Sequence, residues 1–275
     1  MTERTLKEIR GAITEKTIDI LAGYRKAFSR SQPSGQLVLP ENLKEFGMYT
    51  LSLLKSKAFK AGAEPSDKRT HAMRLIRSGS PLTLSLMLYP RIIALHNLEP
   101  EWGFPDATTG HLVVPPSLRA SFSKIDEGGA YLVDDGQTCL LWLHAAVNPN
   151  LLEDLFGEGA DSLQALDPNM TELPVLQTHL NAQVRNLIAY WSTTRTSRAM
   201  TLQLARQGLD GAEYEFARLL LEDRNAEAQS YVDWLVHVHR GVQGELSGQR
   251  KKESGGGEGG GSSLDPMAGL RAMGW

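Results

Sequence analysis

The spacing of the hydrophobic residues changes near residue 100, and this change restricts the folds that the chain can adopt. Up to that point, apolar side chains recur at three- and four-residue intervals, which is the spacing of one face of a helix. The clearest run comprises Leu6, Ile9, Ile13, Ile20, Leu21, Tyr24 and Phe28. Beyond it, short apolar runs are bounded by turn residues, as in β-strands. We therefore predict an α+β protein, in which an all-helical segment precedes a domain that contains a sheet.

The helical segment is predicted to span residues 1–100. Pro40 suits the first position of a second helix, and Ser66 can cap a third one. Pro81 opens a fourth helix, which Pro90 interrupts. No heptad spacing persists, so these helices are expected to form a small array rather than a coiled coil.

Residues 101–244 are predicted to form the second domain. The dipeptide Asp135-Gly136 is a strong hairpin signal, and it would join strands at 131–134 and 138–144. Further strands are predicted at 111–114 and 200–206, and helices are predicted to begin at Pro149, Pro174, Asp210 and Ser230. Strands and helices in this order indicate a small mixed sheet covered by helices.

One hydrophobic core is expected in this domain, because the apolar positions of its elements fall on single stripes. The residues expected to share it are Trp142, Leu180, Val184, Leu187, Trp234 and Leu235. Cys139 is the only cysteine and lies in an apolar run, so a buried, inert thiol is predicted. It cannot form an internal disulfide, which favours a reducing compartment.

Residues 245–275 are predicted to form a disordered, Gly-rich tail. The stretch contains a long run of Gly and Ser after three consecutive cationic residues. Such a composition cannot bury enough apolar surface to offset the entropy lost on ordering. We expect proteases to remove this tail without loss of the folded body.

The charges are unevenly distributed along the chain. Residues 1–100 carry 16 Lys and Arg against 9 Asp and Glu, a net charge of +7, while the remainder is at −10. The basic part could face an anionic membrane or an acidic protein. The residues considered for such a membrane contact are Arg25, Lys26, Lys55, Lys57 and Lys60. The alternative is that both parts are ordinary solvated surface.

No strong catalytic motif is present, and we predict no catalytic, cofactor-binding or metal-binding residue and no cofactor. The GxGxxG match at Gly255 lies in the Gly-rich tail without a flanking strand or helix. His237 and His239 are two positions apart on a predicted helix, so they point to different faces. The overall charge of −3 disfavours nucleic-acid binding. A binding or scaffolding role is therefore favoured over an enzyme.

Four stretches resemble, in the same order, the C-terminal region of one protein family. They are 39–56, with Leu39-Pro-Glu-Asn-Leu-Lys and Tyr49-Thr-Leu-Ser-Leu-Leu-Lys-Ser; 88–96; 131–157, with Tyr131-Leu-Val-Asp-Asp-Gly; and 181–239, with Leu221-Glu-Asp-Arg and Ser230-Tyr-Val-Asp-Trp-Leu. The family is Sec24, the cargo-adaptor subunits of the COPII vesicle coat. Together the stretches make residues 10–243 similar to it.

The resemblance implies a helical domain followed by a gelsolin-like domain. It also implies a function without catalysis in transport from the endoplasmic reticulum to the Golgi. In the family, the adaptor is cytoplasmic and peripheral on the endoplasmic reticulum membrane. Its partners are a sister coat subunit of the Sec23 type, on membranes carrying the small GTPase Sar, and sorting signals in cargo tails.

The chain departs from the family pattern at both ends. The family's zinc finger, trunk and β-sandwich precede this region, so we expect Met1 to start a fragment, a truncated gene model or a degenerate paralogue. The trunk makes the main contact with the sister subunit. We therefore expect no stable complex between that subunit and this chain alone. Weak binding to acidic liposomes at low salt is expected, with release near physiological ionic strength.

Two other hypotheses compete with the coat adaptor. A gelsolin-type actin-binding module would have the same α+β pattern, but the preceding helical segment argues against it. An unrecognised enzyme is the third hypothesis, and only scattered histidines and acidic residues favour it.

Overall fold

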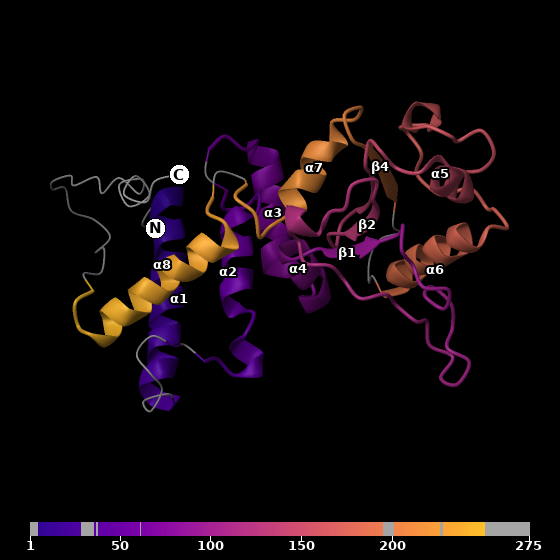
Figure 1. The fold of residues 1–275 in the computed structure, drawn as a ribbon. Coiled ribbons are helices and arrows are strands. Elements are labelled where there is room, and N and C mark those ends of the chain that lie inside the picture. Colours follow the sequence, from indigo (N-terminus) through magenta and orange to yellow (C-terminus); the bar gives the residue numbers. More distant parts are fainter. Residues whose placement is uncertain are drawn as a thin grey trace, which may run out of the picture.

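A four-stranded mixed sheet lies at the centre of the fold (Figure 1). The structure is a computed structural model that describes residues 5–28, 36, 38–60, 62–194, 201–225 and 228–250. The strands lie in the order β1 (Arg91–Ala94), β2 (Ala130–Asp134), β3 (Cys139–Leu143) and β4 (Leu202–Arg206). The first three are antiparallel neighbours, and β4 runs parallel to β3.

Both faces of this sheet are buried, which explains why its strands are continuously apolar rather than alternating. Along β3, Cys139 and Leu141 point to one face, while Leu140 and Trp142 point to the other. Cys139 is fully buried, as predicted for an inert thiol. The sheet is therefore the middle of three layers.

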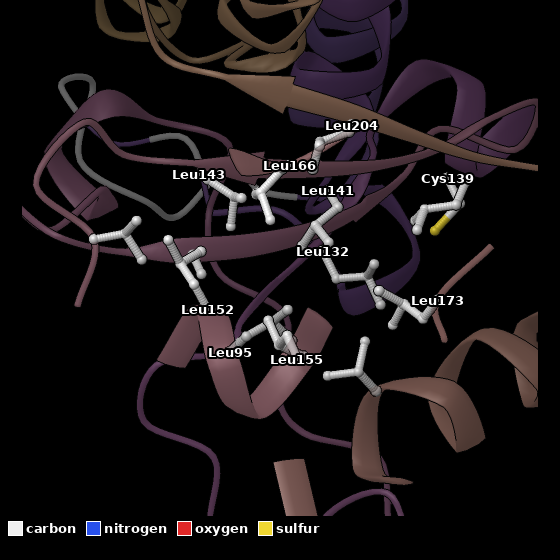
Figure 2. Close-up of a cluster of buried hydrophobic side chains, with 14 of the residues drawn as sticks. Leu95, Leu132, Cys139, Leu141, Leu143, Leu152, Leu155, Leu166, Leu173 and Leu204 are labelled. Carbon is white, nitrogen blue, oxygen red and sulfur yellow. The ribbon is translucent and has the colours of Figure 1, made fainter. Parts of the chain in front are cut away.

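The first face packs against α5 (Pro149–Phe156) and α6 (His179–Thr194). Figure 2 shows Leu152 and Leu155 of α5 directed at the leucines of β2 and β3. Asn148 caps α5 by accepting the N–H of Asn150, and Pro149 occupies the first turn.

The second face packs against α7 (Ala212–Leu219). Phe216 of α7 stacks on Trp142 with ring centroids 4.5 Å apart, and Tyr131 lies beside both. These three aromatic side chains fill the core between the sheet and α7.

The helical segment comprises α1 (Leu6–Phe28), α2 (Phe46–Lys55), α3 (Ser66–Ser78) and α4 (Pro81–Leu88), and the last helix α8 (Tyr231–Leu246) joins it. Figure 1 shows α8 crossing α1 and α2. Gly241 permits this contact, because a Cβ there would lie 2.4 Å from Cδ1 of Ile18. Three short 3-10 helices, Glu41–Leu43, Phe122–Lys124 and Leu163–Ala165, complete the structure that is described.

The prediction of one shared core was wrong. Val184, Leu187 and the half-buried Leu180 lie on the first face of the sheet, and Trp142 lies on the second. Trp234 packs with α1 and α2 in a third cluster, and Leu235 is 42% exposed. The apolar stripe of α8 shows which side of the helix is buried. It does not show which neighbour covers that side.

Several predicted elements also differ from the observed ones. Residues 111–114 contain no strand and form only an isolated bridge between Pro105 and Leu112. The strand β1 follows Pro90 directly and was not predicted. The helix expected from Pro174 begins at His179, and the one expected from Pro40 begins at Phe46. The predicted hairpin at Gly136 is confirmed, with a φ of 80° at that glycine.

The last helix continues past the predicted start of the tail at residue 245. It ends at Leu246, and the Arg250 side chain forms ion pairs with Glu15 and Asp19 of α1. The predicted disorder therefore does not hold for 245–250, because these residues pack on α1. Residues 251–275 lie outside the described part of the chain.

Arg206, the last residue of β4, is buried, and all three nitrogens of its guanidinium donate hydrogen bonds. Its Nε and Nη2 donate to the two carboxylate oxygens of Asp210, each at 2.8 Å. Its Nη1 donates to the carbonyl oxygens of Leu163 and Leu166, each at 2.9 Å. We predicted a helix that begins at Asp210, but α7 begins at Ala212 and its start is not capped by Asp210. The Asp210 carboxylate instead fixes the end of β4 against the 163–166 turn.

The Arg206–Asp210 pair predicts a loss of stability in acid. Hydrogen bonds from Arg206 lower the pKa of Asp210 below its ordinary value of 3.8. Such a carboxylate stabilises the fold above the pKa it has when unfolded, and this contribution is lost as the pH falls through the folded pKa. We expect the stability difference between wild type and Asp210→Asn, measured by urea unfolding, to be constant from about pH 7 to about pH 5 and to shrink as the pH falls from there to about pH 2. A difference that is constant over the whole range would contradict this role.

Candidate functional site

A groove follows the seam where α2 and α4 meet the edge of the sheet. It contains a cavity of about 620 Å³. The cavity is lined by Lys44, Glu45, Met48, Tyr49, Ser85, Leu86, Tyr89, Pro90, Arg91, Ser117, Leu118, Arg119, Glu222 and Tyr231. Half of these side chains are apolar or aromatic and half are polar or charged, so the cavity can offer both apolar contacts and hydrogen bonds to a ligand.

A second cavity of about 340 Å³ shares Arg119, Glu222 and Tyr231 with the first. It extends between the 121–124 turn and the residues that precede α8. We call the two adjoining cavities the seam groove.

Glu222 organises the centre of the seam groove. The hydroxyl of Tyr89 donates to its Oε1 at 2.6 Å, and Nε of Arg119 donates to the same oxygen at 3.0 Å. One of the two terminal amino groups of Arg119, Nη2, donates to Oε2. Burial and the hydrogen bond to Glu222 raise the pKa of Tyr89, so this phenol stays protonated. Hydrogen bonding to Glu222 also raises the pKa of Arg119.

The segment 220–225, which contributes Glu222, is held from both sides. On one side, Nζ of Lys55 donates to the carbonyl oxygens of Leu221 at 2.7 Å and Asp223 at 2.5 Å. On the other, the Asp223 carboxylate accepts from the Ser121 hydroxyl at 3.0 Å and the Phe122 N–H at 2.6 Å. Burial lowers the pKa of Lys55 to about 8, and the charge of Asp223 opposes part of that shift. These contacts join the helical segment to the sheet domain and preform the groove.

Exposed apolar side chains surround the seam groove. Val232 is 69% exposed at the start of α8, and Phe122 is 65% exposed on the neighbouring turn. Tyr49 lies on the α2 side and is 37% exposed. Large apolar groups that gather beside a concavity are typical of protein interaction sites.

Two histidines of the sheet domain, His144 and His179, form hydrogen bonds with nearby backbone groups. Nδ1 of His144 accepts the N–H groups of Gly128 and Ala146. Nε2 of His179 lies 2.9 Å from the carbonyl oxygen of Pro100. Within the described residues, no group of three or more His, Cys, Asp or Glu side chains could hold a metal ion. No described helix is long and apolar enough to span a bilayer.

The five cations considered for a membrane contact do not form an exposed cluster. Arg25 and Lys55 are buried. Lys26, Lys57 and Lys60 form ion pairs with Glu245, Glu215 and Glu64 at 3.3, 3.3 and 3.6 Å. These pairs could not be predicted from the sequence, because two of the acidic partners lie more than 150 residues away from their lysines. Membrane binding by the basic part of the chain stays a prediction, which Lys26, Lys57 and Lys60 could serve only in competition with these carboxylates.

Sequence reasoning did not find the seam groove, because its walls come from segments far apart in the chain. The stretches that resemble the family contain Tyr89 and Glu222, but no site was predicted from them. Arg119 lies outside those stretches and belongs to no motif.

Two protein-family models match the chain. The Sec23/Sec24 helical domain matches residues 1–86, and the gelsolin repeat matches residues 111–188. The first range covers α1 to α4, and the second covers β2, β3, α5 and much of α6.

Individual relatives match most of the chain. Human Sec24C is 32% identical over 244 residues, which is 88% of this chain and 21% of the human protein. The Sec24 protein of Aspergillus clavatus is 33% identical over 246 residues, 86% of this chain and 26% of its own length. This chain thus spans about a fifth to a quarter of these curated relatives.

A solved structure shares the fold. The crystal structure of the human COPII-coat protein Sec24c superposes with a TM-score of 0.74 at 32% identity, covering 88% of this chain and 30% of that chain. The order of the two matched domains, the sequence identity and the common fold agree with one another. The chain therefore belongs to the Sec24 family, in the region that carries the helical and gelsolin-like domains.

Proposed function

We propose that the protein acts as a cargo-adaptor component of the COPII coat in transport from the endoplasmic reticulum to the Golgi. It would act through protein–protein contacts and not as an enzyme. One observation carries the proposal: a Sec24-type helical domain and a gelsolin-like domain occur in one chain and superpose together on Sec24c. The contacts of Lys55 with 221–225 support it, because they join the two domains.

The partners follow from this role. A sister subunit of the Sec23 type is the coat partner, and cargo tails supply sorting signals. The location is the cytoplasmic side of the endoplasmic reticulum membrane, where the protein is peripheral. Because Lys26, Lys57 and Lys60 are paired with carboxylates, we propose that membrane attachment depends on the assembled coat.

A chimera tests the proposed function. Residues 5–250 of this chain would replace the corresponding region of a full-length Sec24 relative, in cells that depend on that relative. We expect the chimera to pellet with the sister subunit on Sar-coated liposomes and to restore export of cargo from the endoplasmic reticulum. As a control, an actin-binding gelsolin module in the same position should fail. A folded chimera that neither joins the coat nor restores export would contradict the proposal.

The gelsolin-type actin-binding module makes the opposite prediction. It requires the purified chain to sediment with actin filaments. That hypothesis does not explain why residues 1–86 match a Sec23/Sec24 helical domain. We therefore expect no sedimentation with actin, either with or without calcium.

A further inference from the structure

The seam groove combines exposed apolar side chains with a cation whose counter-ion is buried. We propose that it binds an extended peptide of a partner protein in which an acidic residue lies next to large apolar residues. This inference rests on the proposed adaptor function, because it names the chemistry of a ligand for that adaptor.

The charge at the centre of the groove favours an acidic ligand. The Arg119 side chain is 63% exposed, whereas its partner Glu222 is only 9% exposed. The carboxylate is occupied by Tyr89 and by two nitrogens of Arg119. The remaining amino group, Nη1, has no hydrogen-bond partner within the described part of the chain. Arg119 therefore presents a positive edge to solvent, and a ligand carboxylate could accept from it in a charge-assisted hydrogen bond.

Of the other acidic groups near this point, Asp223 and Asp233 are also occupied, whereas Glu45 on the α2 side of the first cavity is exposed. The two cavities are lined by five cations (Lys44, Arg91, Arg119, Lys124 and Arg224) against three carboxylates (Glu45, Glu222 and Asp223). The Asp223 carboxylate accepts from Ser121 and Phe122, as described above. The Asp233 carboxylate accepts from Arg224 at 2.7 Å, and the Asp233 backbone N–H donates to the hydroxyl of Ser230, which caps α8. Because these anions are bound internally, they compete little for a cationic ligand. The complementarity is therefore with an anion.

The apolar residues on either side of Arg119 favour flanking apolar side chains. Tyr49 and Tyr231 line the first cavity, and Val232 lines the second. Tyrosines in concave sites are frequent anchors in interfaces, because they bury much area with little loss of side-chain entropy. Arg119 lies where the two cavities join, so an acidic residue there would have an apolar neighbour on each side.

The segment that carries these groups is already fixed without a ligand. Lys55, Asp223 and Glu222 hold 220–225 against α2 and the 119–122 turn. A preformed site avoids the cost of ordering its own residues on binding. The groove is thus suited to a flexible peptide, because only the peptide would lose conformational freedom on binding.

The test measures binding of two labelled peptides to the full chain by fluorescence anisotropy. The probes are fluorescein-Gly-Ser-Leu-Glu-Phe-Ser-Gly-amide and the same peptide with Gln in place of Glu. We expect the Glu peptide to bind at least about tenfold more tightly, since one charge-assisted hydrogen bond distinguishes them.

Groove variants and exposure-matched controls locate the binding. Tyr49→Ala and Val232→Ala should each weaken binding of the Glu peptide about tenfold. Tyr190→Ala and Tyr214→Ala remove side chains of similar exposure, 40% and 70%, that line neither cavity, and they should leave binding unchanged. Arg119→Gln should abolish the preference for Glu over Gln, with thermal melting used to confirm that the variant is folded.

Several outcomes would overturn the inference. Absence of binding, or equal binding of both peptides, would contradict the proposal that the groove binds an acidic ligand. Binding that the groove variants do not affect would place the site elsewhere. A further outcome is a chain that binds neither peptide but self-associates, with the self-association abolished by Val232→Ala. This result would assign the groove to a second copy of the chain. The chimera can still restore export in each of these cases, so this inference and the proposed function can fail separately.

Discussion

Replacing Trp234 with Ala is expected to lower the free energy of unfolding by about 3–5 kcal/mol, the range for a large buried aromatic residue. Trp234 is 4% exposed and packs with α1 and α2 in the third core cluster. Its Nε1 also donates to the carbonyl oxygen of Gly47 at 3.0 Å, and the variant loses this buried hydrogen bond as well. Denaturant unfolding followed by circular dichroism measures the effect.

Leu235 is the matched control for this prediction. It is the next residue on α8 but is 42% exposed, and its replacement by Ala should cost less than about 1 kcal/mol. Limited proteolysis should show cleavage in α1 or α8 of Trp234→Ala before cleavage in the sheet. Wild-type stability of that variant would mean that α8 does not pack as described.

Arg206→Met is the second change with a large expected effect, a loss of roughly 3–5 kcal/mol, as for breaking a buried ion pair on one side. The variant would leave the Asp210 carboxylate without its main partner, and it would remove the side-chain donor to the carbonyl oxygens of Leu163 and Leu166. Methionine fills similar space, so the loss reports the missing hydrogen bonds and charge. Urea unfolding at neutral pH measures it.

An exposed ion pair serves as the comparison. Arg224 and Asp233 form a 2.7 Å pair whose side chains are 72% and 43% exposed. Arg224→Met should cost less than about 1 kcal/mol, because solvent screens such pairs. Equal losses for the two variants would mean that Arg206 contributes only a surface interaction.

Local sequence signals predicted the elements that depend on neighbouring residues. The hairpin at Gly136, the start of α4 at Ser80-Pro81 and the Ser230 cap of α8 are all present. Each depends on backbone conformation or a hydrogen bond within a few residues. A local signal failed where a second partner competed for the same group, as with Asp210, whose carboxylate binds Arg206 four residues before it rather than the start of α7.

Packing between distant segments could not be predicted in the same way. Both Trp142 and Trp234 were recognised as buried, but the sequence did not show that they belong to different clusters. The seam groove depends on the approach of Tyr89, Arg119 and Glu222, which are 30 or more residues apart. Nothing in their local sequence distinguishes them from ordinary polar residues, so only the folded chain identifies the site.

The contact between α1 and α8 has a consequence for synthesis of the protein. The apolar face of α1, including Ile18 and Leu21, is covered by a helix that begins only at Tyr231. About 200 residues must be translated between them, which at ordinary elongation rates takes on the order of ten to forty seconds. During that interval α1 and α2 are fully synthesised, but α8 is not yet present to cover their apolar sides. We expect chaperones to bind the nascent chain at these two helices and to leave when α8 emerges from the ribosome.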